Sequence, residues 1–449
     1  MDILIKAAQL ILSLSILVVL HEFGHYIPAK LFKTRIEKFY LFFNPWFSLF
    51  KKKIGDTEWG IGWLPLGGYV KISGMIDESM DKEQMAQPAQ PWEFRSKKPW
   101  QRLIIMIGGV TVNLLLGMFI YIFVVFGYGE DKLNPNDLKA GISVHPYLQK
   151  YGLVSGDNIL AINGDKVENI LESNTIVMLR DGRKLDVQKA DGTKKTIILP
   201  ATIASELFQN GAMPAFGPRS LGVSIGELDK KAPATKAELM KNDKIIGVNG
   251  NKITYFDEFQ RVLYLSKGKE ITLQINRNGE MIAKTIKIPN TGKYEGKIGF
   301  SNGNGLILDS KKIKHVDYSF GESIGRGIAK GKNTLSDYIA QFKFVFTKKG
   351  ASSVGGFASI GNMFPSAWDW QIFWTNTAFI SIVLAFMNIL PIPALDGGHI
   401  MFLLYEMITG KEAPQKVLEY AQLVGFVLLM GLMLYANGND IFKWLTGAM

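Results

Sequence analysis

The chain has 449 residues, of which 47% are hydrophobic, with 51 basic and 40 acidic residues and a net charge of +11. This composition is apolar for a soluble protein and polar for one embedded throughout in a membrane, so it predicts a mixed architecture. The chain contains no cysteine, which excludes disulfide bonds and thiolate metal ligands. Its basic residues cluster beside apolar runs, which favours anionic lipid over nucleic acid as a partner.

Four apolar segments approach the roughly 20 residues that cross a bilayer. They comprise residues 3–31, 103–128, 373–391 and 417–435. No small-residue cleavage site follows the first segment, so we expect this segment to be retained and not removed as a signal peptide.

The first apolar segment contains a metal-binding pattern, since residues 21–25 read His-Glu-Phe-Gly-His. Residues four apart share a helix face, so His21 and His25 can offer two imidazole nitrogens to one metal, with Glu22 beside them as a base. Ionisable side chains within a membrane are costly unless they have a function. The pattern therefore predicts a zinc peptidase and argues against two merely structural histidines.

Basic residues predict how the chain is oriented. They crowd the stretch between the first two segments, whereas the second segment is followed by Glu130 and Asp131. The positive-inside rule therefore places residues 33–101 in the cytoplasm. Counting spans then puts residues 129–370 and both termini outside, with His21 toward the cytoplasmic end of its helix.

An internal repeat lies between the second and third apolar segments. Residues 153–167 match residues 239–253 at a constant offset, and each copy has short β-forming runs around an Asn-Gly turn. Two domains of like fold are expected. The second copy continues with a predicted helix over 256–265 and a hairpin around Asn278-Gly279.

Both copies carry the pattern Leu-x-x-Gly-Asp-x-Ile-x-x-Ile-Asn-Gly, with Asn242 in place of the usual glycine in the second. This pattern resembles PDZ domains, which commonly add an extended peptide to a sheet edge. Residues 221–223 and 298–300 are faint counterparts of the loop that binds peptide C-termini. Peptide capture and a purely steric role as a size filter both stay open.

Residues 319–349 predict an amphipathic helix, with apolar residues at helical spacing beside several lysines. Such a helix could lie in the outer membrane–water interface or pack on the PDZ pair. Periodicity alone does not say which of these the apolar stripe faces.

A catalytic zinc generally has three protein ligands, so a third must come from elsewhere in the chain. The end of the third apolar segment offers Asp396 and His399. Prolines there end a regular helix, and the glycines at 397 and 398 allow an irregular backbone to approach a metal. On chemistry alone both side chains remain possible ligands.

The stretch 21–25, together with Asn-x-x-Pro-x-Pro-x-Leu-Asp-Gly-Gly-His over 388–399, resembles the site-2 protease family of intramembrane zinc metalloproteases. The two-PDZ insert is similar to that of a bacterial branch of the family. Residues 65–71, the entry to the second segment at 98–102, and Gly108, Gly109 and Asn113 extend the resemblance. Val110 and Phe357 depart from it where the family usually has proline, which puts local packing in doubt more than activity.

The resemblance implies Zn²⁺ as cofactor, Glu22 as the catalytic base and His21, His25 and Asp396 as ligands, with His399 outside the ligand set. It also implies a membrane-associated β-loop over 59–73 whose edge holds an unwound substrate. The substrate-binding residues it implies are Asn388, Pro391, Pro393, Gly67, Gly68 and Tyr69. For Asn388 the alternative is a helix-ending residue before Pro391.

The expected fold is a multi-domain membrane protein with a four-helix zinc protease core, a β-loop and two tandem PDZ domains. The expected parts are a first transmembrane helix (1–32), a cytoplasmic loop with a β-hairpin (33–101), a second transmembrane helix (102–128), PDZ domains 1 (129–215) and 2 (216–305), an interfacial helix and linker (306–370), a third transmembrane segment (371–400), and a fourth transmembrane helix with the C-terminus (401–449).

The resemblance further implies site-2 cleavage of single-span membrane proteins after a first cut. Anti-sigma factors of an envelope stress response, and remnant signal peptides, are the implied substrates, and the bacterial inner membrane is the implied location. A non-catalytic PDZ scaffold and a metal transporter are the rival hypotheses. Glu22 argues against both, because a structural or transported metal needs no base beside it.

Overall fold

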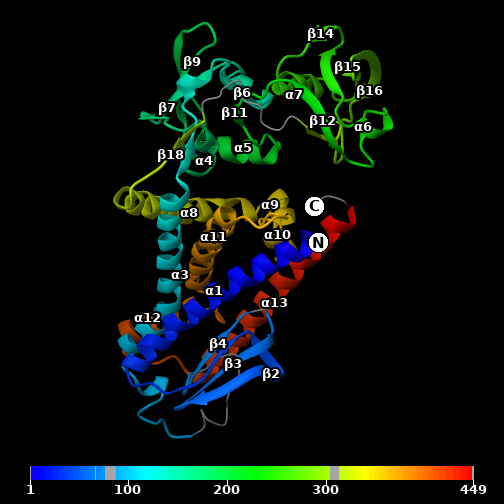
Figure 1. Ribbon diagram of the computed structural model, residues 1–449. Coiled ribbons are helices and arrows are strands. Elements are labelled where there is room, and N and C mark those ends of the chain that lie inside the picture. Colours follow the sequence, from blue (N-terminus) through cyan, green and yellow to red (C-terminus); the bar gives the residue numbers. More distant parts are fainter. Residues whose placement is uncertain (1, 66, 76–86, 304–312, 447–449) are drawn as a thin grey trace. The chain divides into compact units, whose positions relative to one another are not determined.

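The computed structural model describes residues 2–65, 67–75, 87–303 and 313–446 (Figure 1). The chain forms two compact units. Unit 1 combines Met1–Gly129 with Asp317–Met449, and unit 2 is Glu130–Val316. The start of the predicted linker, residues 306–312, lies outside the described residues.

Among the described residues, four helices of unit 1 are long and apolar enough to cross a membrane. They are α1 (Asp2–Leu31), α3 (Pro99–Tyr128), α11 (Trp370–Ile389) and α13 (Gln415–Thr446). These helices coincide with the four predicted apolar segments, so that part of the expectation is confirmed.

Helix α3 is the centre of unit 1, because α1, α11, α8 (Phe320–Val345) and α12 (Asp396–Thr409) all pack against it (Figure 1). Gly24 of α1 meets Gly108 of α3 so closely that a Cβ on Gly24 would lie 2.5 Å from the Gly108 carbonyl oxygen. Small residues allow such backbone contact between membrane helices. This contact brings the histidine-bearing turn of α1 directly onto α3.

The amphipathic helix predicted over 319–349 is formed mainly by α8, which crosses α3 and also contacts α11. Gly327 of α8 packs against the backbone of Ile122, and Gly331 packs against Met118. Part of its surface remains exposed and apolar, including Phe320, Ile324 and Ile339. Two short helices follow it, α9 (Lys348–Ser353) and α10 (Phe357–Gly361).

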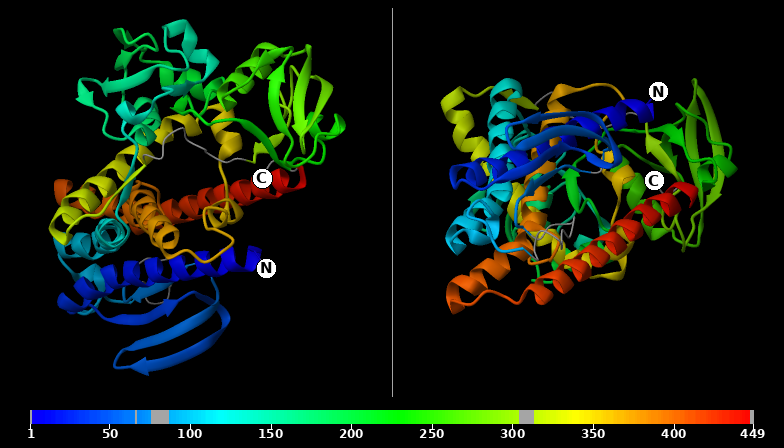
Figure 2. Two further views of the ribbon diagram at one scale, coloured as in Figure 1. Left: turned by 45° about the horizontal axis from the view of Figure 1, so that its top comes forward. Right: turned by 90° about the horizontal axis from the view of Figure 1, so that it is seen from below.

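A four-stranded sheet follows α1. Its strands are β1 (Ile36–Leu41), β2 (Phe43–Ile54), β3 (Thr57–Leu64) and β4 (Tyr69–Ile72). The order is β2-β3-β1-β4, with β1 parallel to β3 and antiparallel to β4. In the left-hand view of Figure 2 the β2–β3 hairpin extends away from the helices, whereas α1 contacts β1 and β4. Strand β4 is therefore the sheet edge next to α1.

The third and fourth membrane-capable helices are separated by an additional element. Helix α11 ends at Ile389, residues 390–395 form a loop, and α12 begins at Asp396. The sequence expectation had one segment over 371–400 followed directly by the last helix. Instead a separate helix, α12, ends at Thr409 with Gly410 as a left-handed cap, and α13 starts at Gln415.

Unit 2 contains the internal repeat as matching elements. In the first copy the strands β7 (Asn158–Ile162) and β8 (Asp165–Lys166) flank an Asn-Gly turn, and in the second β13 (Lys244–Val248) and β14 (Asn251–Lys252) do so. Both residues of each turn have positive φ, the conformation that Asn-Gly hairpin turns adopt. The predicted helix is α7 (Phe256–Leu265), and the predicted hairpin joins β15 (Glu270–Arg277) to β16 (Glu280–Lys287).

The remaining strands and α-helices of unit 2 are short. They are β5 (Glu130–Lys132), β6 (Ile142–Val144), β9 (Lys184–Gln188), β10 (Lys194–Ile198), β11 (Phe216–Pro218), β12 (Val223–Leu228), β17 (Phe300–Asn302), β18 (Lys314–Val316), α4 (Ser173–Leu179), α5 (Ile203–Gln209) and α6 (Pro233–Lys236). Strands β5 and β18 pair, with Glu130 opposite Val316, so the two ends of unit 2 lie side by side.

Candidate active site

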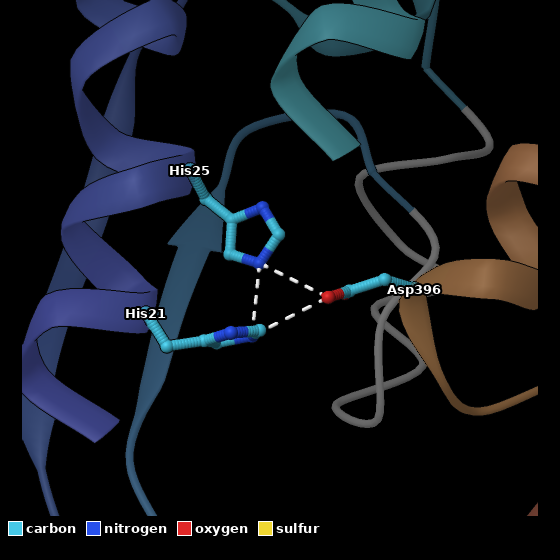
Figure 3. Close-up of side chains that lie close together, drawn as sticks. All are labelled: His21, His25 and Asp396. Atoms are coloured by element: carbon cyan, nitrogen blue, oxygen red, sulfur yellow. Dashed lines mark hydrogen bonds and ion pairs between the residues drawn. The ribbon is translucent and has the colours of Figure 1, made fainter. Parts of the chain in front are cut away.

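Two histidines of α1 and an aspartate more than 350 residues further along the sequence converge in unit 1 (Figure 3). Nε2 of His21 and Nε2 of His25 are 3.2 Å apart. Oδ2 of Asp396 lies 3.3 Å from the first nitrogen and 3.4 Å from the second. The histidines come from one face of α1, and Asp396 is the first residue of α12.

Helix α3 orients both imidazole rings. Nδ1 of His25 donates a hydrogen bond to the backbone carbonyl of Ile105, at 2.8 Å. The side-chain amide of Asn113 lies 3.2 Å from Nδ1 of His21. With the Nδ1 atoms held by α3, both Nε2 atoms face Asp396, and such outer contacts typically fix the tautomer of metal-binding histidines.

The three facing atoms have the spacing of a metal site. Ligand atoms at 2.0–2.1 Å in a tetrahedral zinc centre are about 3.3 Å from one another, which matches all three separations. Oδ2 of Asp396 is buried, and no described residue gives it a hydrogen bond of good geometry. A buried carboxylate oxygen without a donor is costly, whereas a cation among the three atoms would satisfy it. The residues present therefore fit zinc.

Glu22 follows His21 on α1 and is 8% exposed. Its side chain lines a cavity of about 600 Å³ that is also lined by His21, His25 and Asp396. Val70 of the edge strand β4 lines the same cavity. A carboxylate is thus placed beside the candidate metal site and against the edge strand of the sheet.

The other predicted site residues divide into two groups. Gly68 and Tyr69 line the cavity, as does His399. Gly67, Asn388, Pro391 and Pro393 are not among its lining residues, although Pro393 borders a neighbouring cavity of about 280 Å³. Asn388 lies in the last turn of α11. Among the described residues, the group of three potential metal ligands contains Asp396 and does not contain His399.

Sequence reasoning did not single out several polar lining residues, among them Lys38, Asn44 and, in the apolar helix α13, Gln422. For Gln422 the available signal was a glutamine within an apolar segment, because polar side chains are uncommon there without a function. Met75 and Met106, which also line the cavity, carry no such signal, since apolar residues in a membrane protein are expected everywhere.

Gly109 of α3 provides a test of this arrangement. A Cβ at this position would lie 2.6 Å from Cε1 and 2.8 Å from Nε2 of His21, and closer still to Nε2 of His25. We therefore expect Gly109→Ala to displace the imidazoles and to weaken zinc binding by roughly 10-fold or more, with a parallel loss of activity. Zinc content after exposure to a graded series of chelator concentrations measures this.

Gly127→Ala is the matched control, because it makes the same change in the same helix where an added methyl group meets no atom within 4 Å. This variant should keep its zinc. Equal zinc retention in the two variants would show that α3 does not pack against the histidines as described.

Comparison with known proteins gives matches over nearly the whole chain. A family model described as Peptidase family M50 matches residues 9–432. A relative from Neisseria meningitidis whose name includes the words zinc metalloprotease is 29% identical over 453 residues, covering 97% of this chain and 98% of the relative. Regulator of sigma E protease from Haemophilus influenzae is 25% identical over 464 residues, covering 99% and 100%. Regulator of sigma-E protease RseP from Salmonella typhimurium is 26% identical over 475 residues, again covering 99% and 100%.

Proposed function

This chain belongs to peptidase family M50, the site-2 protease family of zinc metalloproteases, and from that premise we propose that it cleaves single-span membrane proteins within their membrane segment. The observation that carries the proposal is the convergence of His21, His25 and Asp396 beside Glu22. Two of the helices involved, α1 and α3, are long and apolar enough to span a membrane.

The proposed mechanism assigns one task to each side chain. His21, His25 and Asp396 would hold a zinc ion, which would supply Lewis-acid chemistry for the scissile carbonyl and for the attacking water. Glu22 takes a proton from the attacking water and passes it to the departing amine nitrogen. Ile105 and Asn113 keep the imidazole rings in the orientation that the site needs.

A substrate helix must unwind before hydrolysis, because its carbonyls are engaged in internal hydrogen bonds. We propose that β4 receives the opened segment as an added strand. In support, β4 is an edge strand and its residues Tyr69 and Val70 line the cavity. The Tyr69 hydroxyl donates to Oδ1 of Asn44 at 2.9 Å, which holds this edge in place.

Further substrate contacts are proposed at Gly67, Gly68, Asn388, Pro391 and Pro393, by similarity to the family. Asn388 precedes the loop that leads to Asp396, and Pro391 and Pro393 lie within this loop. They would meet the substrate segment as it approaches the cavity, while β4 holds it from the other side.

The biological substrates that we propose are of the anti-sigma-factor type, with remnant signal peptides as a second class. The relatives named as regulators of sigma E support this assignment. The basic residues between α1 and α3 support a bacterial inner-membrane location, with residues 33–101 and the active site toward the cytoplasm. Unit 2 and both termini would then lie in the periplasm.

Hydrolysis itself can be tested with purified protein in detergent and a model single-span substrate. We expect cleavage within the apolar segment of the substrate, loss of cleavage on chelation, and recovery when zinc is added back. Cleavage that is unaffected by chelation would contradict the proposed chemistry.

We propose that unit 2 consists of two PDZ domains that restrict cleavage to substrates already trimmed by a first protease. Because Glu130 pairs with Val316, residues 130–316 can be replaced by a short glycine linker without separating the ends of unit 1. The deletion variant should cleave trimmed substrate as before and should also cleave full-length substrate.

Trimmed substrate serves as the control for folding of the deletion variant. If this variant cleaves trimmed substrate but leaves full-length substrate intact, unit 2 is not the filter. Peptide capture by the PDZ domains would then be the remaining role.

A further inference from the structure

Gln422 is a buried polar side chain in an apolar helix. It is 8% exposed and belongs to α13, one of the membrane-capable helices. Burying an amide in such surroundings is costly unless it is hydrogen-bonded. The side chain lines both the 600 Å³ cavity around the histidines and the neighbouring 280 Å³ cavity.

The hydrogen bond of Gln422 reaches the loop that carries Asp396. Its Oε1 accepts the backbone N–H of Ala394 at 3.1 Å. Ala394 has a φ of 78°, in the left-handed region that is strained for residues other than glycine. Such a conformation persists where its surroundings hold it, and the Gln422 acceptor is one of the groups that do so.

A second contact from the same face of α13 supports the first. Gly425 lies three residues after Gln422 and so shares its helix face. Its backbone packs against the carbonyl of Pro393 so closely that no side chain could be accommodated there. Helix α13 therefore holds two consecutive loop residues, Pro393 and Ala394, from one side.

The position of Ala394 determines that of Asp396, because the backbone between and around these residues is closely packed. Asp396 is two residues after Ala394 and begins α12. Gly397 packs against the backbone of Ile389 and Leu390, and Gly398 packs against that of Ile392 and Pro393. A shift of Ala394 would thus move the carboxylate relative to the two histidines.

Helix α13 is also anchored at its other end. Asp440 accepts hydrogen bonds from the backbone N–H groups of Gly356 and Ser359, each at 2.9 Å. Between these anchors much of α13 is exposed, and in the right-hand view of Figure 2 it lies apart from α1. The contacts of Gln422 and Gly425 therefore have two roles. They attach α13 to the rest of unit 1, and they position the loop over residues 390–395.

We propose that Gln422 is a positioning residue, which places Asp396 in the metal site through the backbone of Ala394. The inference deepens the proposed function and rests on it. It adds a residue on α13 to a site whose other parts come from α1, α3 and α12.

The test replaces Gln422 by Met, which keeps the length of the side chain and removes its acceptor. We expect the Gln422→Met protein to lose zinc to a chelator at about 10-fold lower chelator concentration than the wild type. The kcat should fall by a similar factor while KM changes less than about twofold, since a displaced ligand affects the chemical step more than substrate docking.

Gln422→Glu should restore most of both properties, because a carboxyl group offers an acceptor oxygen in either protonation state. Gln415→Met is the control, since Gln415 bonds to Glu419 within α13. Gly425→Ala, which pushes on Pro393 independently, should weaken zinc retention as Gln422→Met does. It provides the readout if Gln422→Met proves unstable.

Wild-type zinc retention and kcat in both Gln422→Met and Gly425→Ala would overturn the inference. If Asp396→Asn loses zinc in the same experiment, the proposed function stands although the inference about Gln422 falls. If Asp396→Asn also behaves as the wild type, the proposed metal site itself is wrong.

Discussion

Glu22→Gln is expected to lower kcat for a model transmembrane substrate by about 10³-fold, within the range for loss of a general base. The amide keeps the shape of the side chain but cannot accept the proton from water. Since Glu22 is outside the group of potential ligands, zinc content should stay near that of the wild type. Single-turnover cleavage and metal analysis on the same preparation measure both quantities.

Glu280→Gln provides a matched control, since Glu280 is an exposed residue of β16 in unit 2. It should leave cleavage unchanged. Appreciable cleavage by the Glu22→Gln protein would remove Glu22 from the mechanism. Loss of zinc in that protein would instead make Glu22 a ligand.

Asp396→Asn should lose both zinc and activity, by about 100-fold or more in zinc affinity. Its amide removes the negative charge that lies 3.3–3.4 Å from both imidazole nitrogens, and an amide oxygen is a poor zinc ligand compared with a carboxylate. Zinc-to-protein ratios after passage through chelator-containing buffer give the measurement.

His399→Ala makes the comparison decisive, because His399 lines the same cavity and is an equally good ligand type. We expect this variant to keep its zinc. Zinc retained in Asp396→Asn but lost in His399→Ala would reverse the ligand assignment.

The sequence was most informative where the signal is local. Apolar runs located α1, α3, α11 and α13, and the spacing of His21 and His25 placed both on one helix face. In unit 2 the Asn-Gly turns and the helix over 256–265 were predicted at their observed positions. Each of these features depends on neighbours within a few residues or on the length of one apolar run.

Long-range contacts were less predictable from the chain alone. The proximity of Asp396 to His21 rests on helix packing around α3, and only the family resemblance selected Asp396 over His399. The parallel pairing of β1 with β3 depends on a crossover that alternating residues do not encode. The short helix α12 could not be separated from its apolar neighbours, because hydropathy does not show where a loop interrupts them.

The amphipathic helix illustrates the same limit. Its residues predicted an apolar stripe but not the partner of that stripe. Gly327 and Gly331 allow α8 to approach α3, and glycines within a helix normally indicate lower stability when no partner is known. Gln422 was missed for a similar reason, since its partner is a backbone N–H in a loop with an unusual conformation.

The central claim is that His21, His25 and Asp396 hold one zinc ion, and anomalous diffraction at the zinc edge from crystals of the wild-type protein tests it most directly. The account predicts an anomalous peak within bonding distance, about 2.0–2.2 Å, of all three side chains. A fully zinc-loaded protein whose peak lies elsewhere, or whose peak is ligated by His399 in place of Asp396, would contradict it.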